Sequence, residues 1–314
     1  MKLFQHLEDL SDDVRGAVVA WGNYDGLHKG HLAVLERTKT IARELGAPLA
    51  VLTTEPHPRQ YFAPDGPSFR LMTLHTKAQA LEEFGADALF VLTFDKALAN
   101  TPAQDFISDI LIGKLGVRHV VTGFNQRFGK GRGGGPNVLM HMGEMEGFGV
   151  TIVEAQQSGE EVYSSSRIRE HLRDGDPRKA AELMGHPWRI EGRVEMGDQR
   201  GRTIGFPTAN IAWGDYLEPA LGVYAVRVLI EDSPHAGTFD GVANIGRRPT
   251  FDKSEINFEA HLFDFEGDIY GAHITVELIA FLRPEQKFDG LDALKTQIAV
   301  DSDQARAIME SDRL

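Results

Sequence analysis

The stretch GNYDGLHKGH at residues 22–31 places His28 and His31 three positions apart. It follows the apolar run AVVAW (17–21) and precedes the patterned segment LAVLERTKTIARELG (32–46), so the histidines lie at the predicted start of a helix. Residues three apart share one face of a helix. A helix N-terminus offers free N–H groups and the positive end of the helix dipole. Two imidazoles there can donate hydrogen bonds to phosphate groups.

Two other interpretations of this histidine pair are open on spacing alone. The pair could bind zinc, although the sequence has no HExxH motif and no third ligand at a convincing spacing. It could also belong to a capped polar corner whose histidines face water. No GxxxxGK[ST] follows a predicted strand and no GxGxxG opens the first helix, which excludes the common phosphate-binding loops.

The charge distribution favours small anionic ligands over nucleic acid. The chain has 33 Lys and Arg against 46 Asp and Glu, a formal net charge of −13, which is unfavourable for a protein that must neutralise a nucleic-acid backbone. The basic residues nevertheless gather in small islands: Arg127, Lys130 and Arg132; Arg167, Arg169 and Arg173; Arg200 and Arg202; Arg247 and Arg248. Such islands suit a nucleotide, and solvated surface charge is the alternative.

Length and composition predict a soluble protein of two domains. At 314 residues, with 42% apolar and 25% charged residues, the chain can bury two cores. The absence of cysteine excludes disulfides, thiolate metal sites and cysteine nucleophiles, and it fits a reducing compartment. No signal-peptide pattern and no run long enough to span a bilayer are found, so we expect a cytoplasmic protein without a membrane partner.

The first half of the chain alternates between strand and helix patterns. The predicted strands are 17–21, 48–53, 87–94, 117–122 and 149–154, and the predicted helices between them are 31–45, 76–85 and 102–116. Such alternation predicts a doubly wound α/β domain with a parallel sheet and right-handed crossovers. Ligands of these sheets bind beyond the carboxyl ends of the strands, which is where the histidine pair lies.

Beyond about residue 185 the apolar period changes to two. In FEAHLF (258–263), for example, Phe258, Ala260 and Leu262 alternate with Glu259, His261 and Phe263. Short strands separated by Gly, Pro and Asp predict a small antiparallel β-barrel. The last segment, 288–314, predicts a helix, a break and a second helix. We therefore expect domains at 1–185 and 186–314.

Five motifs in order resemble those of one enzyme family. GNYDGLHKGH resembles the nucleotidyltransferase motif GxFDGxHxGH, and GFNQRFGKGRGG (123–134) and SSSRIREHL (164–172) are similar to the GxDFRFG and SSTxIR elements of its bacterial flavin branch. GRTIGFPTANI (201–211) resembles the kinase signature GxxxGFPTAN, and GVANIGRRPTF and EAHLFDFEGDIYG follow it. Together they resemble the bifunctional riboflavin kinase/FAD synthetase family.

The resemblance implies a Rossmann-like nucleotidyltransferase domain followed by a small antiparallel barrel with a terminal helix. It implies that the barrel phosphorylates riboflavin to FMN with ATP. The first domain then transfers AMP from ATP to FMN, giving FAD and pyrophosphate. Mg²⁺ is the implied cofactor of both reactions. The implied partners are small molecules, with no nucleic acid, and the implied state is a monomer or weak homo-oligomer.

In the first domain, the resemblance gives His28 and His31 the catalytic role of holding the ATP phosphates and the charge that develops at the α-phosphorus. The other implied nucleotide-binding residues are Asn23, Asp25, Gly26, Ser164, Ser165 and Arg169. The implied flavin-binding residues are Phe62, Asn125, Arg127 and Phe128. Serines at a helix start are also ordinary caps, and a core position is the ordinary alternative for Phe62. Gln126 and Trp21 depart from the family's usual residues, and Gln126 puts the packing beside Asn125 in question.

In the second domain, the resemblance implies that Thr208 and Asn210 present oxygens to Mg²⁺ and phosphate, a ligand set that suits a hard cation. Glu259 is the implied base for the riboflavin 5′-hydroxyl, and a solvent-facing strand glutamate is its alternative. Arg202 and Gly205 are implied at the nucleotide, and Arg306 at the flavin. Two other functions remain open: a nucleotidyltransferase for another acceptor whose barrel only binds ligand, and a flavin-binding regulator without turnover.

Overall fold

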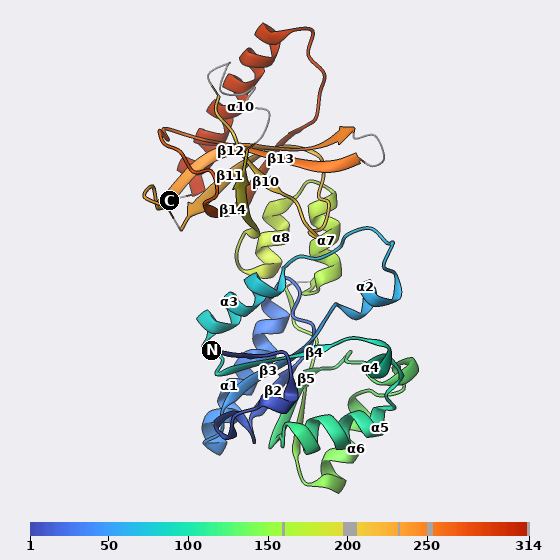
Figure 1. Ribbon diagram of the computed structural model, residues 1–314. Helices are drawn as coiled ribbons and strands as arrows, with labels where there is room; N and C mark the ends of the chain where they lie inside the picture. Colours follow the sequence, from blue (N-terminus) through green and yellow to red (C-terminus); the bar gives the residue numbers. More distant parts are fainter. Residues whose placement is uncertain (159–160, 197–205, 232, 250–253, 313–314) are drawn as a thin grey trace. The chain divides into compact units, whose positions relative to one another are not determined.

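The computed structural model describes residues 1–158, 161–196, 206–231, 233–249 and 254–312 (Figure 1). The chain forms two compact units. The first comprises Met1–Pro67 and Leu74–Ser164, and the second comprises Ser68–Thr73 and Ser165–Leu314. The two helices α7 (Ser165–Arg173) and α8 (Pro177–Met184) belong to the second unit. The domain boundary expected at residue 185 stays a prediction.

The first unit is built on a sheet of parallel strands, as the alternating pattern predicts. Among the described residues, the sheet has six strands in the order β1 (Lys2–Phe4), β4 (Ala88–Thr93), β3 (Leu49–Glu55), β2 (Val18–Trp21), β5 (His119–Gly123) and β6 (Gly149–Val153). All neighbouring strands pair in parallel. The edge strand β1 was not predicted, because three residues are too few to show a period.

Helices connect these strands. They are α1 (Lys29–Leu45), α2 (Pro58–Phe62), α3 (Leu74–Phe84), α4 (Lys96–Asn100), α5 (Ala103–Asp105) with the π-helix Phe106–Lys114, and α6 (Pro136–Glu146). Short 3₁₀ turns occupy Leu7–Asp9, Asp12–Val14 and Lys130–Arg132, and β7 (Gln157–Ser158) pairs with β8 (Glu161–Val162). Helix α1 ends as predicted at Gly46, whose φ of 57° gives a left-handed C-cap.

The helix predicted at 102–116 is present, with two features that the apolar pattern did not indicate. The Thr101 hydroxyl donates to the Ala97 carbonyl at 3.0 Å, so it closes α4 and does not cap the next helix. From Phe106 the chain is wound as a π-helix, and the Leu115 N–H accordingly bonds to the Ile110 carbonyl five residues back. A 3.6-residue pattern does not distinguish this winding from an α-helix.

The second unit contains a closed antiparallel barrel, as the period of two predicts. In the part of the chain that the structure describes, the barrel order is β10 (Ala209–Ala212), β13 (Ser254–Leu262), β12 (Gly237–Pro249), β11 (Gly222–Ile230), β14 (His273–Pro284) and β9 (Trp188–Glu195). Ala209, Ile211, Phe258 and Ala260 are buried, so these alternate residues point into the barrel.

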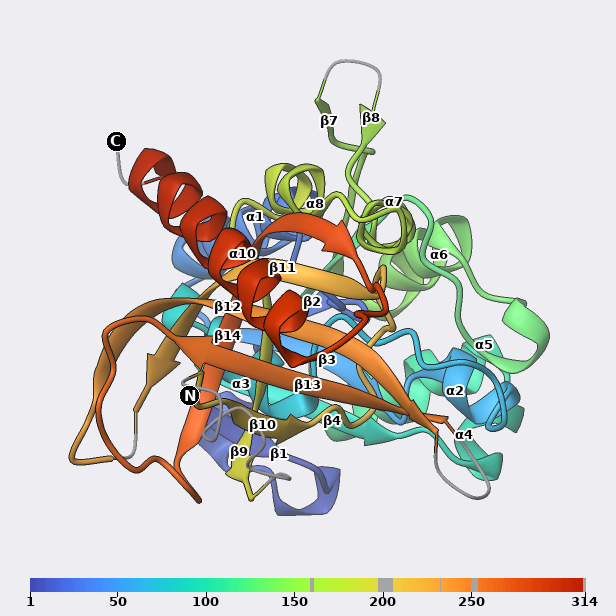
Figure 2. The same cartoon turned by 90° about the horizontal axis from the view of Figure 1, so that it is seen from above.

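One helix, α10 (Leu291–Asp312), packs against the outside of β11, β12 and β14 (Figure 2). The predicted break within this segment is wrong. Asp301, 3% exposed, accepts from Arg283 at 2.7 and 2.9 Å and from Gln297 at 2.9 Å. These bonds hold the polar stretch against the barrel, so tertiary contacts override its weak helix propensity.

A short segment from the first half of the sequence is part of the second unit. The backbone carbonyls of Ser68–Thr73 accept from Arg169 Nε at 2.7 Å, Trp188 Nε1 at 2.8 Å and the Leu217 N–H at 2.8 Å. Trp188 is 1% exposed, so its indole N–H needs this internal acceptor. The sequence patterns did not indicate that this segment belongs to the second unit.

Candidate active sites

The turn from β2 to α1 has an unusual backbone. Tyr24, Gly26 and Leu27 have φ of 51°, 88° and 39°. Positive φ is uncommon for residues with a side chain and costs about 1–3 kcal/mol at each such position. Such conformations cluster at ligand-binding sites. We call residues 22–31 the histidine corner.

The two histidines of this corner stack on one another. Their ring centroids are 3.6 Å apart and the ring planes differ by 18°. His28 is the N-cap of α1, and its Nδ1 accepts from the His31 backbone N–H at 3.3 Å. Because Nδ1 is an acceptor, a neutral His28 ring carries its proton on Nε2. The ring that caps the helix through Nδ1 thus has its N–H on the opposite side of the imidazole.

Gly30 makes room for the stacked rings. A Cβ at this position would lie 3.1 Å from the His28 ring and 3.3 Å from the Tyr163 carbonyl. Tyr24 closes the corner from inside: it is 1% exposed, and its ring centroid is 5.1 Å from that of His31. Burial raises the pKa of the Tyr24 phenol, so the group stays neutral. Asp25, 3% exposed, is buried in the same corner.

The predicted flavin residues of the first unit follow β3 and β5. The carboxyl ends of parallel strands meet at one edge of a sheet, so these residues share an edge with the histidine corner. Asn125 and Arg127 are exposed, as is Asn23 of the corner. Phe62 is 69% exposed and packs edge-on with Tyr61 and Phe94, at centroid distances of 5.2 and 5.8 Å. The core alternative for Phe62 is therefore wrong, and its flavin contact stays a prediction.

Phe128 lies in the core instead. It is 7% exposed, and its ring centroid is 4.7 Å from Trp21 and 5.9 Å from Phe106. Trp21 and Phe106 are themselves stacked at 4.8 Å. The unusual Trp21 thus fills the space beneath the loop that carries Asn125 and Arg127. Phe128 supports that loop by packing, and its direct contact with flavin stays a prediction.

The serine–arginine motif marks the start of α7. Ser164 and Ser165 are half-buried. Arg169 is 8% exposed, donates through Nε to the Phe69 carbonyl at 2.7 Å and lies over the Phe69 ring, with 5.3 Å from Cζ to the ring centroid. Arg169 therefore has a packing role within the second unit, and the nucleotide contacts of all three residues stay predictions.

The barrel brings the predicted kinase residues together. Asn210 on β10 is directly opposite Glu259 on β13, and Thr208 Oγ1 donates to Glu259 Oε2 at 3.4 Å. These residues alternate with the buried Ala209 and Phe258, so they share the outer face of the barrel. Glu259 is half-buried and hydrogen-bonded, and its role as the base stays a prediction. Arg202 and Gly205 lie outside the described residues.

Sequence reasoning missed two neighbours of Glu259. Asn257 Nδ2 donates to Glu259 Oε1 at 2.8 Å, and Asn244 on β12 is directly opposite Glu259. We call Thr208, Asn210, Asn244, Asn257 and Glu259 the polar face. Asn257 could have been found from the period of two, which puts it on the same side as Glu259, whereas Asn244 required the strand register.

The polar face is rich in hard oxygen donors. The Asn210 amide oxygen and the Glu259 carboxylate come from the paired strands β10 and β13, and the Thr208 hydroxyl comes from the residue just before β10. Such donors fit Mg²⁺, which binds few protein oxygens and keeps several waters.

Arg306 of α10 is held by an acid. Its guanidinium donates to both carboxylate oxygens of Asp264, at 2.7 and 2.9 Å, and lies over the Phe263 ring, with 4.3 Å from Cζ to the centroid. The hydrogen bonding that Arg306 donates to Asp264 lowers the pKa of the Asp264 carboxyl and raises the pKa of the Arg306 guanidinium. Its predicted contact with flavin stays a prediction.

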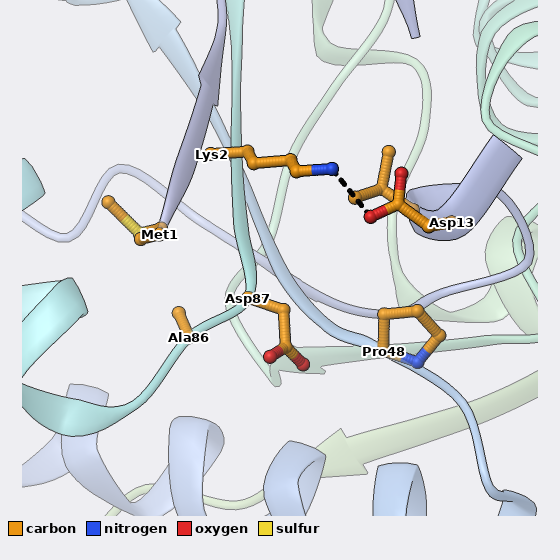
Figure 3. A pocket seen from close by; sticks show the side chains of 7 residues that line it. Met1, Lys2, Asp13, Pro48, Ala86 and Asp87 are labelled. Carbon is orange, nitrogen blue, oxygen red and sulfur yellow. Dashed lines mark hydrogen bonds and ion pairs between the residues drawn. The ribbon is translucent and has the colours of Figure 1, made fainter. Parts of the chain in front are cut away.

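A surface hollow of about 510 Å³ lies where the strands of the sheet begin, opposite the end that carries the histidine corner (Figure 3). Its lining includes Lys2, Asp13, Pro48 and Asp87, and Lys2 Nζ is 2.6 Å from the Asp13 carboxylate. Pro48 and Asp87 immediately precede β3 and β4, so the hollow is at the amino ends of these strands. Parallel sheets bind ligands at the carboxyl ends, which makes this hollow a poor candidate for the active site.

The fold and the matching family models define a transferase with one nucleotidyltransferase domain and one kinase domain. The family model for FAD synthetase matches residues 10–167, and the model for riboflavin kinase matches residues 184–309. The chain therefore belongs to the bifunctional riboflavin kinase/FMN adenylyltransferase family. It is an enzyme with these two activities, with FAD synthetase first and riboflavin kinase second along the chain.

Curated relatives are similar over almost the whole chain. The bifunctional riboflavin kinase/FMN adenylyltransferase of Escherichia coli K12 is 41% identical over 308 residues, which cover 98% of this chain and 97% of the relative. The enzyme of the same name from Haemophilus influenzae is 39% identical over 314 residues, covering 99% and 100%. That of Bacillus subtilis 168 is 38% identical, covering 94% and 93%.

A solved structure shares the fold of nearly the complete chain. It is titled a macrolide-efflux protein from Streptococcus pneumoniae, with a TM-score of 0.85, 31% identity and coverage of 97% of this chain and 98% of that one. Within the described ranges of the present protein, no helix is both long enough and apolar enough to cross a membrane.

Proposed function

We propose that the phosphorylation of riboflavin takes place on the polar face of the barrel. The observation that carries this proposal is the meeting of Thr208 and Asn210 with Glu259, including a 3.4 Å contact between Thr208 and Glu259, which are 51 positions apart in the sequence. Glu259 accepts the proton of the riboflavin 5′-hydroxyl as that oxygen attacks the γ-phosphorus of ATP. The Asn257 amide holds one carboxylate oxygen of this base in place.

The adenylyl transfer to FMN belongs to the histidine corner. The FMN phosphate attacks the α-phosphorus of ATP and pyrophosphate leaves, so negative charge builds up on the oxygens around that phosphorus. His28 and His31, at the N-terminus of α1, donate hydrogen bonds to these oxygens. The positive end of the helix dipole stabilises the same negative charge. Asn23, Asp25 and Gly26 shape the turn that aims them.

Mg²⁺ would be held in the kinase site by Thr208 and Asn210, where the ion neutralises phosphate charge when bound. The residues do the remaining work. Thr208 and Asn210 align the phosphates along β10, and Glu259 faces the acceptor hydroxyl. Phosphoryl transfer depends mostly on positioning and charge neutralisation, and a base of this kind contributes about 10²–10⁴-fold.

We also propose a domain boundary, a cellular compartment and an oligomeric state for the enzyme. We expect the two activities to divide at about residue 185, with 1–185 for adenylyl transfer and 186–314 for the kinase. We also expect a cytoplasmic protein, because the sequence has no cysteine, and a monomer or weak homo-oligomer whose partners are ATP, riboflavin and FMN. Light scattering on the purified chain would measure the mass directly.

The test uses riboflavin, ATP and Mg²⁺ with chromatographic separation of the flavins. The full chain should form FMN and then FAD, and EDTA should stop both steps. His28→Ala combined with His31→Ala should still form FMN but no FAD. Glu259→Ala should slow FMN formation, while FMN supplied from outside is still converted to FAD.

This reciprocal pattern distinguishes loss of chemistry from loss of fold, because each variant retains one activity as its own control. A double histidine variant that loses both activities although it remains folded would refute the assignment to separate sites. Unchanged kinase turnover in Glu259→Ala would remove Glu259 from the role of base.

A further inference from the structure

His261 lies on the same side of β13 as Glu259, two positions further along the strand. Its ring is half-buried, and its Nδ1 is 2.8 Å from the backbone carbonyl of Pro207. A carbonyl oxygen can only accept, so Nδ1 carries the proton and donates it to this bond. The bond connects the strand of the predicted base with the residue just before Thr208.

Within the described part of the chain, the segment that receives this bond lies just before the strand pairing of β10. Strand β10 begins at Ala209, so Phe206–Thr208 precede the ladder with β13. Pro207 has no backbone N–H and cannot donate to a ladder. The His261 side chain instead donates to the Pro207 carbonyl, which precedes the residues paired with β13. The Phe206 ring adds an edge-on contact, with its centroid 5.4 Å from that of the imidazole.

We propose that His261 is a positioning residue for phosphoryl transfer, which fixes the Pro207–Thr208 peptide so that the Thr208 hydroxyl faces Glu259. The proposal rests on the roles proposed for Thr208 and Glu259. Only one rotatable backbone bond and the side-chain torsion separate the held carbonyl from the Thr208 hydroxyl, which is 3.4 Å from Glu259. Without the bond from His261, that hydroxyl loses its fixed direction.

Three substitutions separate the hydrogen bond from the volume of the ring. His261→Asn places an amide N–H about where Nδ1 is, His261→Gln places it one bond further out, and His261→Leu has none. Kinase kcat in His261→Leu and His261→Gln should fall about five- to tenfold, the effect of one positioning hydrogen bond, and KM for Mg–ATP should rise. His261→Asn should recover most of the loss, and the KM for riboflavin should stay unchanged in all three.

Conversion of supplied FMN to FAD by the same samples is the internal control and should not change. Equal loss in His261→Asn and His261→Leu would overturn the proposal, and so would kinase constants within twofold of the parent in His261→Leu. Thr208→Ala and Glu259→Gln are measured in parallel. If those two variants also leave the kinase kcat and KM unchanged, the proposed site itself is wrong. If only the His261 variants leave these constants unchanged, only this inference fails.

Discussion

The histidine corner and the polar face are suited to the same chemical group, a polyphosphate, but they are built in different ways. The corner uses ten consecutive residues, a turn with three positive φ angles and the N-terminus of α1. The polar face uses side chains from β10, β12 and β13, which meet only because the strands pair in one register. The first offers N–H donors and a dipole, and the second offers oxygen donors for a cation.

The two sites should therefore tolerate different substitutions. The corner depends on local backbone shape, so a small change of volume within it should be damaging. The polar face depends on individual oxygen and nitrogen atoms on a stiff sheet, so loss of one polar atom should reduce one activity while the barrel remains folded. The following variants test this contrast, with the largest expected effect first.

Asn210→Leu removes an amide oxygen from the polar face while β10 keeps its backbone pairing. We expect FMN formation to fall about 10²–10³-fold, the usual effect of losing one preorganised electrostatic contact. Steady-state assays over a range of Mg²⁺ and ATP would measure it. Thr238→Leu, an exposed substitution on β12, controls for added apolar surface. A fall that also appears in the conversion of supplied FMN to FAD would indicate general damage and contradict the contrast.

Gly30→Ala adds a single carbon to the histidine corner. The new Cβ would lie 3.1 Å from the His28 ring, which is already stacked at 3.6 Å on His31. We expect the ring to shift and FAD formation to fall about 10- to 100-fold, because small misplacements of catalytic groups are costly. The free energy of unfolding should not fall, since alanine favours the helix more than glycine.

Gly46→Asn is the matched control for this variant, at the other end of the same helix. Gly46 has φ of 57°, and a Cβ added there would have no other atom within 4 Å. Asparagine tolerates that backbone conformation. We expect full activity. If Gly30→Ala were also fully active, the corner would not need its tight geometry.

Asn257→Ala tests a residue that supports the base within the polar face. It removes the 2.8 Å hydrogen bond to Glu259 but leaves the base itself and its contact with Thr208. Kinase kcat should fall about three- to tenfold, in line with the net effect of one hydrogen bond. The rate of FAD formation from FMN should be unchanged. A loss as large as that of Glu259→Ala would mean that Asn257 does more than orient the carboxylate.

His119→Gln should have the smallest effect, on the stability of the first unit in acid. Burial, and then the charge of Arg37, lower the pKa of His119, whose Nε2 is 2.8 Å from Thr151 Oγ1. The unfolded chain therefore takes up a proton near pH 6.5 before the folded chain does. Stability from this group is full above that pH and is lost as the pH falls through the folded pKa.

A glutamine does not titrate, so denaturant unfolding of His119→Gln should depend less on pH between 7 and 5 than unfolding of the parent chain. The exposed His141→Gln serves as the control and should follow the parent. Identical pH profiles for the parent and His119→Gln would show that His119 does not contribute.

Part of the fold and of the sites could be predicted because the signals are local. The strands β2 to β6 follow apolar runs, and the barrel follows a period of two. The corner could be predicted because its glycines, aspartate and histidines are consecutive. The unbroken α10 could not be predicted, since its polar stretch is held by a contact between Asp301 and Arg283 of β14. The π-winding at Phe106–Lys114 could not be predicted either, because a 3.6-residue pattern does not distinguish it from an α-helix.

The two kinds of sheet and the histidine corner follow from the amino-acid sequence alone, because hydrophobic period and turn chemistry act between near neighbours. Only the tertiary structure decided that Phe128 is a core residue, that Ser68–Thr73 belongs to the second unit, and that Asn244, Asn257 and His261 surround Glu259 and Thr208. The physical reason is that strand register and burial are set by contacts between segments far apart in the chain.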